Sequence, residues 1–165
     1  MALTLPVNFK NHVQSRDTSL VPVVRFRDTE GSNPIYISTV SEYISPTAQW
    51  LPLLLNIPSL KESIDLESRK YQISSISLSM SNVIYEGKRF SEIVTELYGS
   101  MINTECRIYW TAPNSDSIRT TTDIEETDAL AFQIFNGKVR KYSHDDEKVM
   151  ISIEDNSQST LHRDL

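Results

Sequence analysis

Alternation of apolar and polar side chains is the main pattern along this chain of 165 residues. The pattern is strictest over residues 76–81, where Ile76, Leu78 and Met80 alternate with serines. Successive side chains of a β-strand point to opposite faces, so this segment predicts a strand with one buried face and one serine face. Shorter segments of the same kind predict further strands at residues 3–9, 20–27, 35–39, 106–110 and 149–154.

The apolar faces of these strands predict a shared core. Its expected members are Ile76, Leu78, Met80, Ile108, Trp110, Ile151 and Ile153. Turn-forming residues at 11–19 and 28–34, the pair Asn136-Gly137 and a charged turn at 143–148 separate the strands. Short strands divided by turns are typical of an antiparallel sandwich or a partly closed barrel, so we expect a mainly β fold.

One segment has helical spacing instead. Phe90, Ile93, Val94 and Leu97 recur at i, i+3, i+4 and i+7, which is one face of a helix. The sequence therefore predicts one short helix at about Phe90–Tyr98, with Ser91 as its N-cap and Gly99 as its stop.

A proline-rich arm over residues 45–58 interrupts the alternation. Its three prolines exclude a continuous helix or a central strand, and they surround Trp50 and the run of residues 53–55. Two interpretations remain open. The arm is either a buried plug at one end of the core or an exposed apolar arm that docks on a neighbouring subunit.

Length and patterning predict an N-terminal arm at residues 1–19 and a single β-barrel-like domain at 20–165, with a mobile acidic loop at 112–128. No segment has the length of a membrane span or the pattern of a secretory signal, so we expect a soluble, intracellular protein without membrane insertion. The net charge of −6 argues against a dominant nucleic-acid-binding surface.

The sequence offers little catalytic chemistry. Cys106 is the single thiol, which excludes an intramolecular disulfide framework, and its strand parity predicts an inert buried residue. The acids around His144 fit a solvated hairpin tip or a cation site, although they lack calcium-loop spacing. No phosphate-binding, dinucleotide-binding or protease motif occurs. We therefore predict no catalytic residue, no cofactor and no metal, and we favour a binding or structural module over an enzyme.

Several segments together resemble a known family. They are residues 35–39, 51–54, 57–65, 69–75, 82–85, 87, 90–91, 137–141, 143–149, 154–155 and 161–165. In that order they resemble the N-terminal domain of tail baseplate hub proteins from marine, cyanophage-like tailed phages. Gly137 and Val139, followed by a charged turn and the strand from Val149, are similar to the β-barrel that hub and tail-tube proteins share.

The resemblance implies a structural virion protein of a phage tail that assembles in the host cytoplasm. Such domains form a ring, trimeric or hexameric, around the tail channel and join tube, spike and baseplate parts. DNA would be only a passing genome in that channel, and an acidic protein suits its sliding because like charges repel. The candidate inter-subunit contacts are Trp50, Leu53, Leu54, Leu55, Ser75, Ser77 and Ser79.

Family members usually continue past the segment at residues 162–165, so this chain is expected to be a compact version or a first domain. Two other classes stay open, a small hydrolase directed at the cell wall and a carbohydrate- or peptide-binding β module. Convergent polar groups in a cleft would favour the enzyme, and exposed aromatic side chains along a groove would favour the carbohydrate-binding module.

Overall fold

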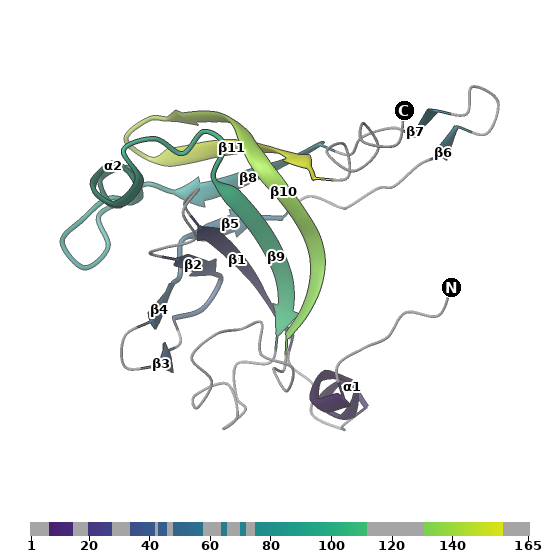
Figure 1. Cartoon of the computed structure of the whole chain (residues 1–165). Coiled ribbons are helices and arrows are strands. Elements are labelled where there is room, and N and C mark those ends of the chain that lie inside the picture. The colour runs from purple at the N-terminus through teal and green to yellow at the C-terminus, as the bar shows by residue number, and fades with distance from the viewer. Residues whose placement is uncertain are drawn as a thin grey trace. The chain divides into compact units, whose positions relative to one another are not determined.

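Strands make up most of the residues that the computed structural model describes (Figure 1). The residues that the structure describes are 7–14, 20–27, 34–41, 43–45, 48–57, 64–65, 70–71, 75–111 and 131–156. The acidic loop predicted at residues 112–128 lies outside them. Within the described part, no helix is long and apolar enough to cross a membrane.

The chain divides into two compact units. Unit 1 consists of Met1–Arg25, Ile35–Pro52 and Arg107–Phe135. Unit 2 consists of Phe26–Pro34, Leu53–Cys106 and Asn136–Leu165. Three strands have residues in both units, namely β1 (Val21–Arg27), β9 (Glu105–Thr111) and β10 (Ala131–His144). The predicted boundaries of an arm at 1–19 and one domain at 20–165 stay a prediction.

Unit 1 is a strand layer with a short helix. Its own elements are α1 (Val7–Val13), β2 (Ile35–Ser38), β3 (Tyr43–Ser45) and β4 (Ala48–Leu51), and its strand order is β3-β4-β2-β1-β9-β10. The pair β2 and β4 is parallel, with Tyr36 opposite Trp50. Val23, Ile37 and Trp50 are fully buried and form part of its core.

Prolines divide the arm over residues 45–58 into short strands. Pro46 lies between β3 and β4, and Pro52 lies between β4 and the next strand. Proline lacks the N–H group that a sheet ladder needs, which explains why each strand is so short.

Two predictions for unit 1 were wrong. Residues 7–13 form a helix where alternation predicted a strand, and the ring of Phe9 packs 5.6 Å from that of Phe132. Trp110, a predicted core residue, is 37% exposed. Ile108 and Tyr109 are both buried, so the alternation of buried and exposed residues in β9 changes phase between Ile108 and Trp110. The Trp110 side chain is therefore partly exposed.

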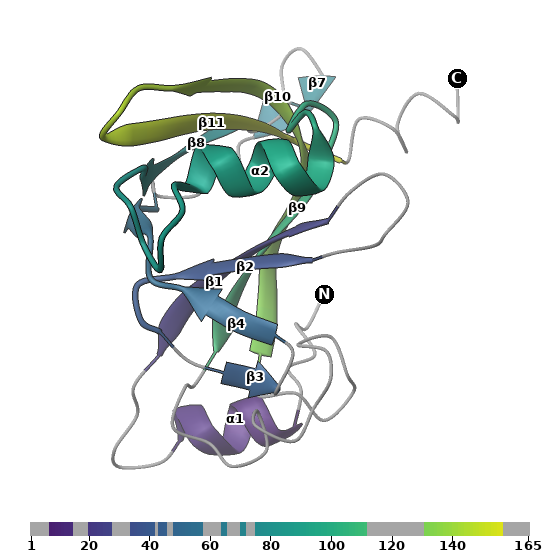
Figure 2. The ribbon, with the colours of Figure 1, turned by 90° about the vertical axis from the view of Figure 1, so that its left-hand side faces the viewer.

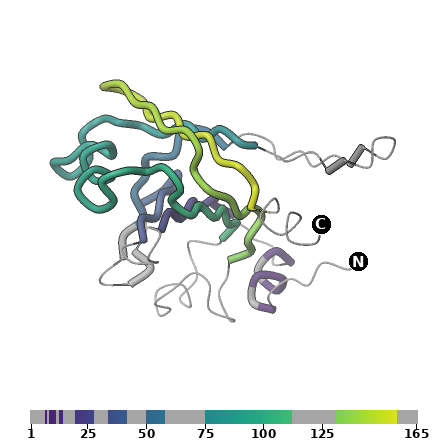
Figure 3. Tube along the Cα trace, turned by 45° about the horizontal axis from the view of Figure 1, so that its top comes forward, coloured from purple at the N-terminus to yellow at the C-terminus, as the bar shows by residue number. Residues whose placement is uncertain are grey.

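Unit 2 is an antiparallel sheet with a helix beside it (Figure 2). Its own elements are β5 (Leu54–Asn56), β6 (Ile64–Asp65), β7 (Lys70–Tyr71), β8 (Ser75–Ser81), α2 (Phe90–Tyr98) and β11 (Lys148–Asp155). The strand order is β10-β11-β8-β5, and β6 and β7 pair separately. Figure 3 shows β8 running beside the long hairpin of β10 and β11.

The pair Asn136-Gly137 does not form the predicted turn. Both residues lie inside β10, where Gly137 pairs with Asp155 of β11 and the carbonyl of Asn136 accepts from the N–H of Asn156 (3.1 Å). Pairing along the whole hairpin therefore overrides the local turn preference. The turn occurs instead at the predicted charged segment, between His144 and Lys148.

Helix α2 has the predicted bounds, although its first turn is capped differently. The N-cap is Arg89, whose backbone N–H donates to Oε2 of Glu92 (2.8 Å), so the prediction of Ser91 as N-cap was wrong. Gly99 ends the helix at a positive φ of 65°, a conformation that favours glycine, and its N–H donates to Thr95. The mainly β fold with this helix is confirmed, and α1 is an additional helix.

Candidate interaction surface

Strand β8 has the two different faces that its sequence predicts. Ile76, Leu78 and Met80 are at most 5% exposed, while Ser75 and Ser77 are exposed. On the buried face, the register with β11 places Leu78 opposite Ile151, and neighbouring apolar pairs continue the contact in both directions. Cross-strand apolar pairs of this kind stabilise a sheet, so the buried face carries the core of unit 2.

The opposite face carries uncharged and apolar side chains at its centre, with Glu154 opposite Ser75 and Lys148 opposite Ser81 at its two ends. Met150 of β11 lies opposite Ser79 and is 46% exposed. Leu55 of β5 is 53% exposed. It lies where the β5–β8 register shifts, between Leu54, which pairs with buried Met80, and exposed Asn56, which pairs with Ser79, so Leu55 lies beside Ser79. We call the set of Leu55, Ser75, Ser77, Ser79 and Met150 the serine face.

The structure places the predicted contact residues at two different levels of exposure. Leu55 and the three serines lie together on the serine face. Trp50, Leu53 and Leu54 are 0%, 3% and 6% exposed, which favours the buried-plug interpretation for those three side chains. Their role as inter-subunit contacts stays a prediction. Trp50 belongs to unit 1, and the other predicted contacts belong to unit 2.

Met150 was missed by the sequence analysis. The signal was present, because Val149 and Ile151 are core residues and the side chain between them must point away from the core. The pairing register between β8 and β11, which places Met150 opposite Ser79, could not be predicted from the sequence.

The outer edge of β8 is only partly covered by β5. The N–H of Ser81 donates to the carbonyl of Leu53 (2.7 Å), so the backbone groups of Ser75 and Ser77 point to the same side. Within the part of the chain that the structure describes, β5 pairs with β8 at Met80 and Ser79. Among the described residues, no strand pairs with this edge at residues 75–77.

A buried asparagine organises the other end of β8. Asn82 is 1% exposed, and its Nδ2 donates to the carbonyl of Asp145 (2.6 Å). Its Oδ1 accepts from the backbone N–H of Ser91 (3.0 Å), one of the helix-end donors that the α2 ladder leaves unsatisfied. Asn82 thus ties together β8, the start of α2 and the β10–β11 turn.

Charged groups support the same junction. Oδ1 of Asp145 accepts from the backbone N–H groups of Lys148 (2.7 Å) and Glu147 (2.8 Å). These backbone hydrogen bonds lower the pKa of Asp145, because they stabilise its ionised form. The guanidinium of Arg89 donates to Oδ1 of Asp146 (2.7 Å), which holds the turn against the start of α2.

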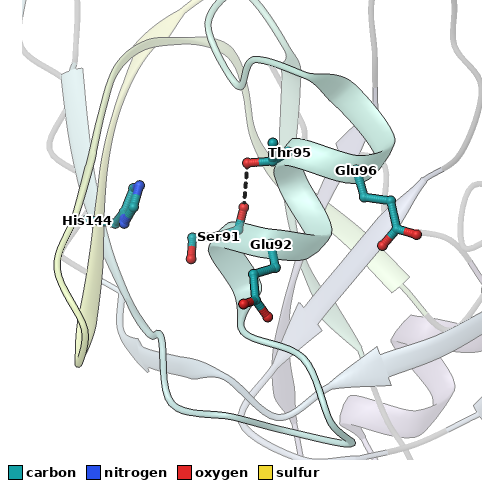
Figure 4. Close-up of a pocket in the computed structure, with 5 residues that line it drawn as sticks. All are labelled: Ser91, Glu92, Thr95, Glu96 and His144. Carbon is teal, nitrogen blue, oxygen red and sulfur yellow. Dashed lines mark hydrogen bonds between the residues drawn. The ribbon is translucent and has the colours of Figure 1, made fainter.

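A small cavity opens next to this junction (Figure 4). It is lined by Ser91, Glu92, Thr95 and Glu96 of α2 and by His144 of β10. No hydrogen bond joins Ser91 to His144 in the described part of the chain. The described residues also contain no group of three His, Cys, Asp or Glu side chains that could hold a metal ion.

Unit 2 contains two further groups with potential reactivity, the thiol of Cys106 and the phenol of Tyr142. Cys106 is fully buried, as its strand parity predicted. Burial raises the pKa of Tyr142, whose hydroxyl has no hydrogen-bond partner among the described residues. A neutral phenol with a buried hydroxyl and a buried thiol both fit a packing role.

Comparison with known proteins adds one structural similarity. No protein-family model and no curated protein matches this sequence. The fold is similar to a chain described as "Virion of native gene transfer agent (GTA) particle", with a TM-score of 0.60 and 10% sequence identity over 93% of this chain. This chain spans 46% of that chain. At this identity the similarity shows a shared fold.

Proposed function

We propose that this protein is a structural virion component of a phage tail, a baseplate or hub module that forms a ring around the tail channel. The similarity in fold to a chain of a virion, over nearly the whole of this chain, is the observation that carries the proposal. The ordered resemblance of the sequence to baseplate hub proteins supports it independently. The ring, trimeric or hexameric, joins tube, spike and baseplate parts and lets the genome pass.

The serine face and the partly covered edge of β8 are the proposed contacts between subunits. Serine side chains carry no charge, so burying them against a partner avoids the large desolvation cost of an ionised group. Leu55 and Met150 add exposed apolar area on either side of Ser79. Apolar area surrounded by small polar residues is typical of a surface that another protein covers.

Sizing and imaging the purified protein test this proposal. We expect sedimentation to give a trimer or hexamer and electron microscopy to show rings, alone or together with other tail proteins. Ser77→Arg places a charge in the centre of the serine face and should shift the protein to monomers. Ser100→Arg, at an exposed residue outside that face, is the matched control. A monomer at every concentration that also fails to join tail proteins would contradict the proposal.

A further inference from the structure

The side of the serine face that borders β10 carries positive charge. Lys141 of β10 lies opposite Ser152 of β11, and Lys138 lies opposite Glu154. Both β11 residues lie in turn opposite serines of the serine face. Side chains of directly opposed residues point to the same face of a sheet, so the two lysines border the serine face. All of these residues belong to unit 2.

A β-bulge directs Lys141 to this face. Val139 pairs with Ile153 and the next pair is Lys141 with Ser152, so β10 has one extra residue, Arg140, at this point. Val139 is fully buried. In a regular ladder, residue 141 would point to the same face as Val139, which is the core face. The bulge therefore turns this lysine away from the core and onto the serine face.

The serine face is positive although the whole chain is acidic, with a net charge of −6. Lys148 adds a third exposed lysine at one end of the face. The carboxylate of Glu154 is paired with Arg140, with 2.7 Å between Oε2 and Nε. Lys138 and Lys141 are exposed and form no ion pair with another described residue. Two serine faces brought together would oppose like charges, so this face fits an acidic surface better than its own copy.

The turn between β10 and β11 has the opposite charge. It closes the long hairpin (Figure 3), and Asp145, Asp146 and Glu147 are consecutive and exposed in it. Asp146 pairs with Arg89 while its side chain stays 94% exposed, and the carbonyl of Glu147 accepts from the N–H of Asn82 (2.8 Å). These bonds fix the conformation of the turn, so a partner that binds it has little ordering entropy to overcome.

We propose that the serine face of one copy of this chain binds the acidic β10–β11 turn of the next copy. This contact rests on the proposed function, because it assigns the two surfaces that meet within the ring. Lys141 lies against the carboxylate of Glu147 in the next copy, while Leu55 and Met150 contribute apolar area at the centre of the face. A contact between two different surfaces is heterologous and can close into a ring. Opposite charges at its rim fix the orientation and speed the encounter.

The salt dependence of association tests the sign of the charge contact. Raising the salt concentration from about 0.01 M to about 0.15 M shortens the Debye length from about 30 Å to about 8 Å. We expect sedimentation to show association weakened about threefold or more, because salt screens the attraction between face and turn. A contact between two serine faces predicts the reverse, since salt would then screen a repulsion.

Charge reversal identifies the two surfaces. Lys141→Glu and Glu147→Lys should each weaken association about tenfold, and the variant with both changes should return to within about threefold of wild type. Within one copy the strand from residue 141 to the turn already spans about 13 Å, so this recovery reports a contact between copies. The matched control combines Lys141→Glu with Glu96→Lys, which gives the same net charge but changes an exposed acid of α2. It should not recover.

The outcomes separate this contact from the ring itself. A wild type that stays monomeric, alone and with other tail proteins, would overturn the ring and the contact together. A wild type that assembles would overturn the contact alone if salt strengthened its association, if either single reversal left it unchanged, or if the control recovered as well as the matched pair. Circular dichroism on each variant confirms that a loss of association is not a loss of folding.

Discussion

The two faces of the unit 2 sheet are made by the same strands and differ sharply in burial. On one face, Ile76, Leu78 and Ile151 are buried almost completely. On the other, Ser77 and Met150 of the same strands are exposed. A sequence that alternates with a period of two can therefore place the stabilising core on one face of a sheet and leave the other face exposed and available to a partner.

The largest effect is expected on the buried face. Ile151→Ala should lower the free energy of unfolding by about 2–5 kcal/mol, because it removes buried methyl groups and leaves a cavity opposite Leu78. Chemical denaturation measures the loss. Met150→Ala, one residue away on the other face, is the control and should cost less than about 1 kcal/mol. Equal costs for the two variants would show that the faces are not distinct.

The sequence alone predicts the difference in burial between the two faces of β8, because its alternation is regular and only one face is buried. The same reasoning failed at β9. Cys106 and Ile108 are buried as alternation predicts, and the same alternation predicts that Trp110 is buried too. Tyr109 is buried instead, and Trp110 is exposed. Alternation predicts orientation only where one face is solvated, and burial on both faces removes that information.

The junction at Asn82 could not be predicted for a different reason. Its partners lie 9 and 63 residues away in the sequence, at Ser91 and Asp145. Local motifs place Ser91 at a helix start and Asp145 in a turn, but only the register of β8, β10 and β11 brings them to one side chain. Long-range geometry of this kind has no local sequence signature.

The second-largest effect is expected at that junction, where the buried face ends. Asn82→Ala leaves the N–H of Ser91 and the carbonyl of Asp145 without their partner, and should cost about 1–3 kcal/mol of unfolding free energy. Hydrogen exchange should show faster exchange at the Ser91 amide.

Asn82→Asp is the control for the separate bonds of this side chain. It keeps an oxygen for the Ser91 N–H but removes the donor to Asp145, so it should protect the amide of Ser91 better than alanine does. Equal protection of the Ser91 amide in wild type and Asn82→Ala would contradict the capping role.

A smaller effect is expected from the turn that closes the hairpin. Backbone hydrogen bonds from Lys148 and Glu147 lower the pKa of Asp145 in the folded state. This stabilisation is present above the unfolded-state pKa of about 3.9 and is lost as the pH falls through the lower folded-state pKa. Asp145→Asn should therefore show a smaller decrease in denaturation midpoint than wild type when the pH is lowered from 5 to about 2.

The salt dependence separates this cause from general charge repulsion. Short-range backbone hydrogen bonds persist at high ionic strength, whereas interactions between exposed charges are screened. The difference between wild type and Asp145→Asn should therefore remain in 1 M salt, where the Debye length is about 3 Å. A difference that disappears in salt would assign the effect to the neighbouring charges instead.

The smallest effect on stability, and the sharpest test of the comparison, is expected on the serine face. Leu55→Ser and Met150→Ser should each change the unfolding free energy by no more than about 0.5–1 kcal/mol, because both side chains are about half exposed. Both should nevertheless reduce the oligomeric fraction in sedimentation, since they remove the apolar area proposed to meet a neighbouring subunit.

Val83→Ser is the matched control, because Val83 is also 53% exposed in unit 2 but lies outside the sheet. If Val83→Ser reduced assembly as strongly as Leu55→Ser, general surface hydrophobicity would explain the association, and the serine face would have no special role. Loss of assembly in the two sheet variants alone would show that the face opposite the core is the one that recognises a partner.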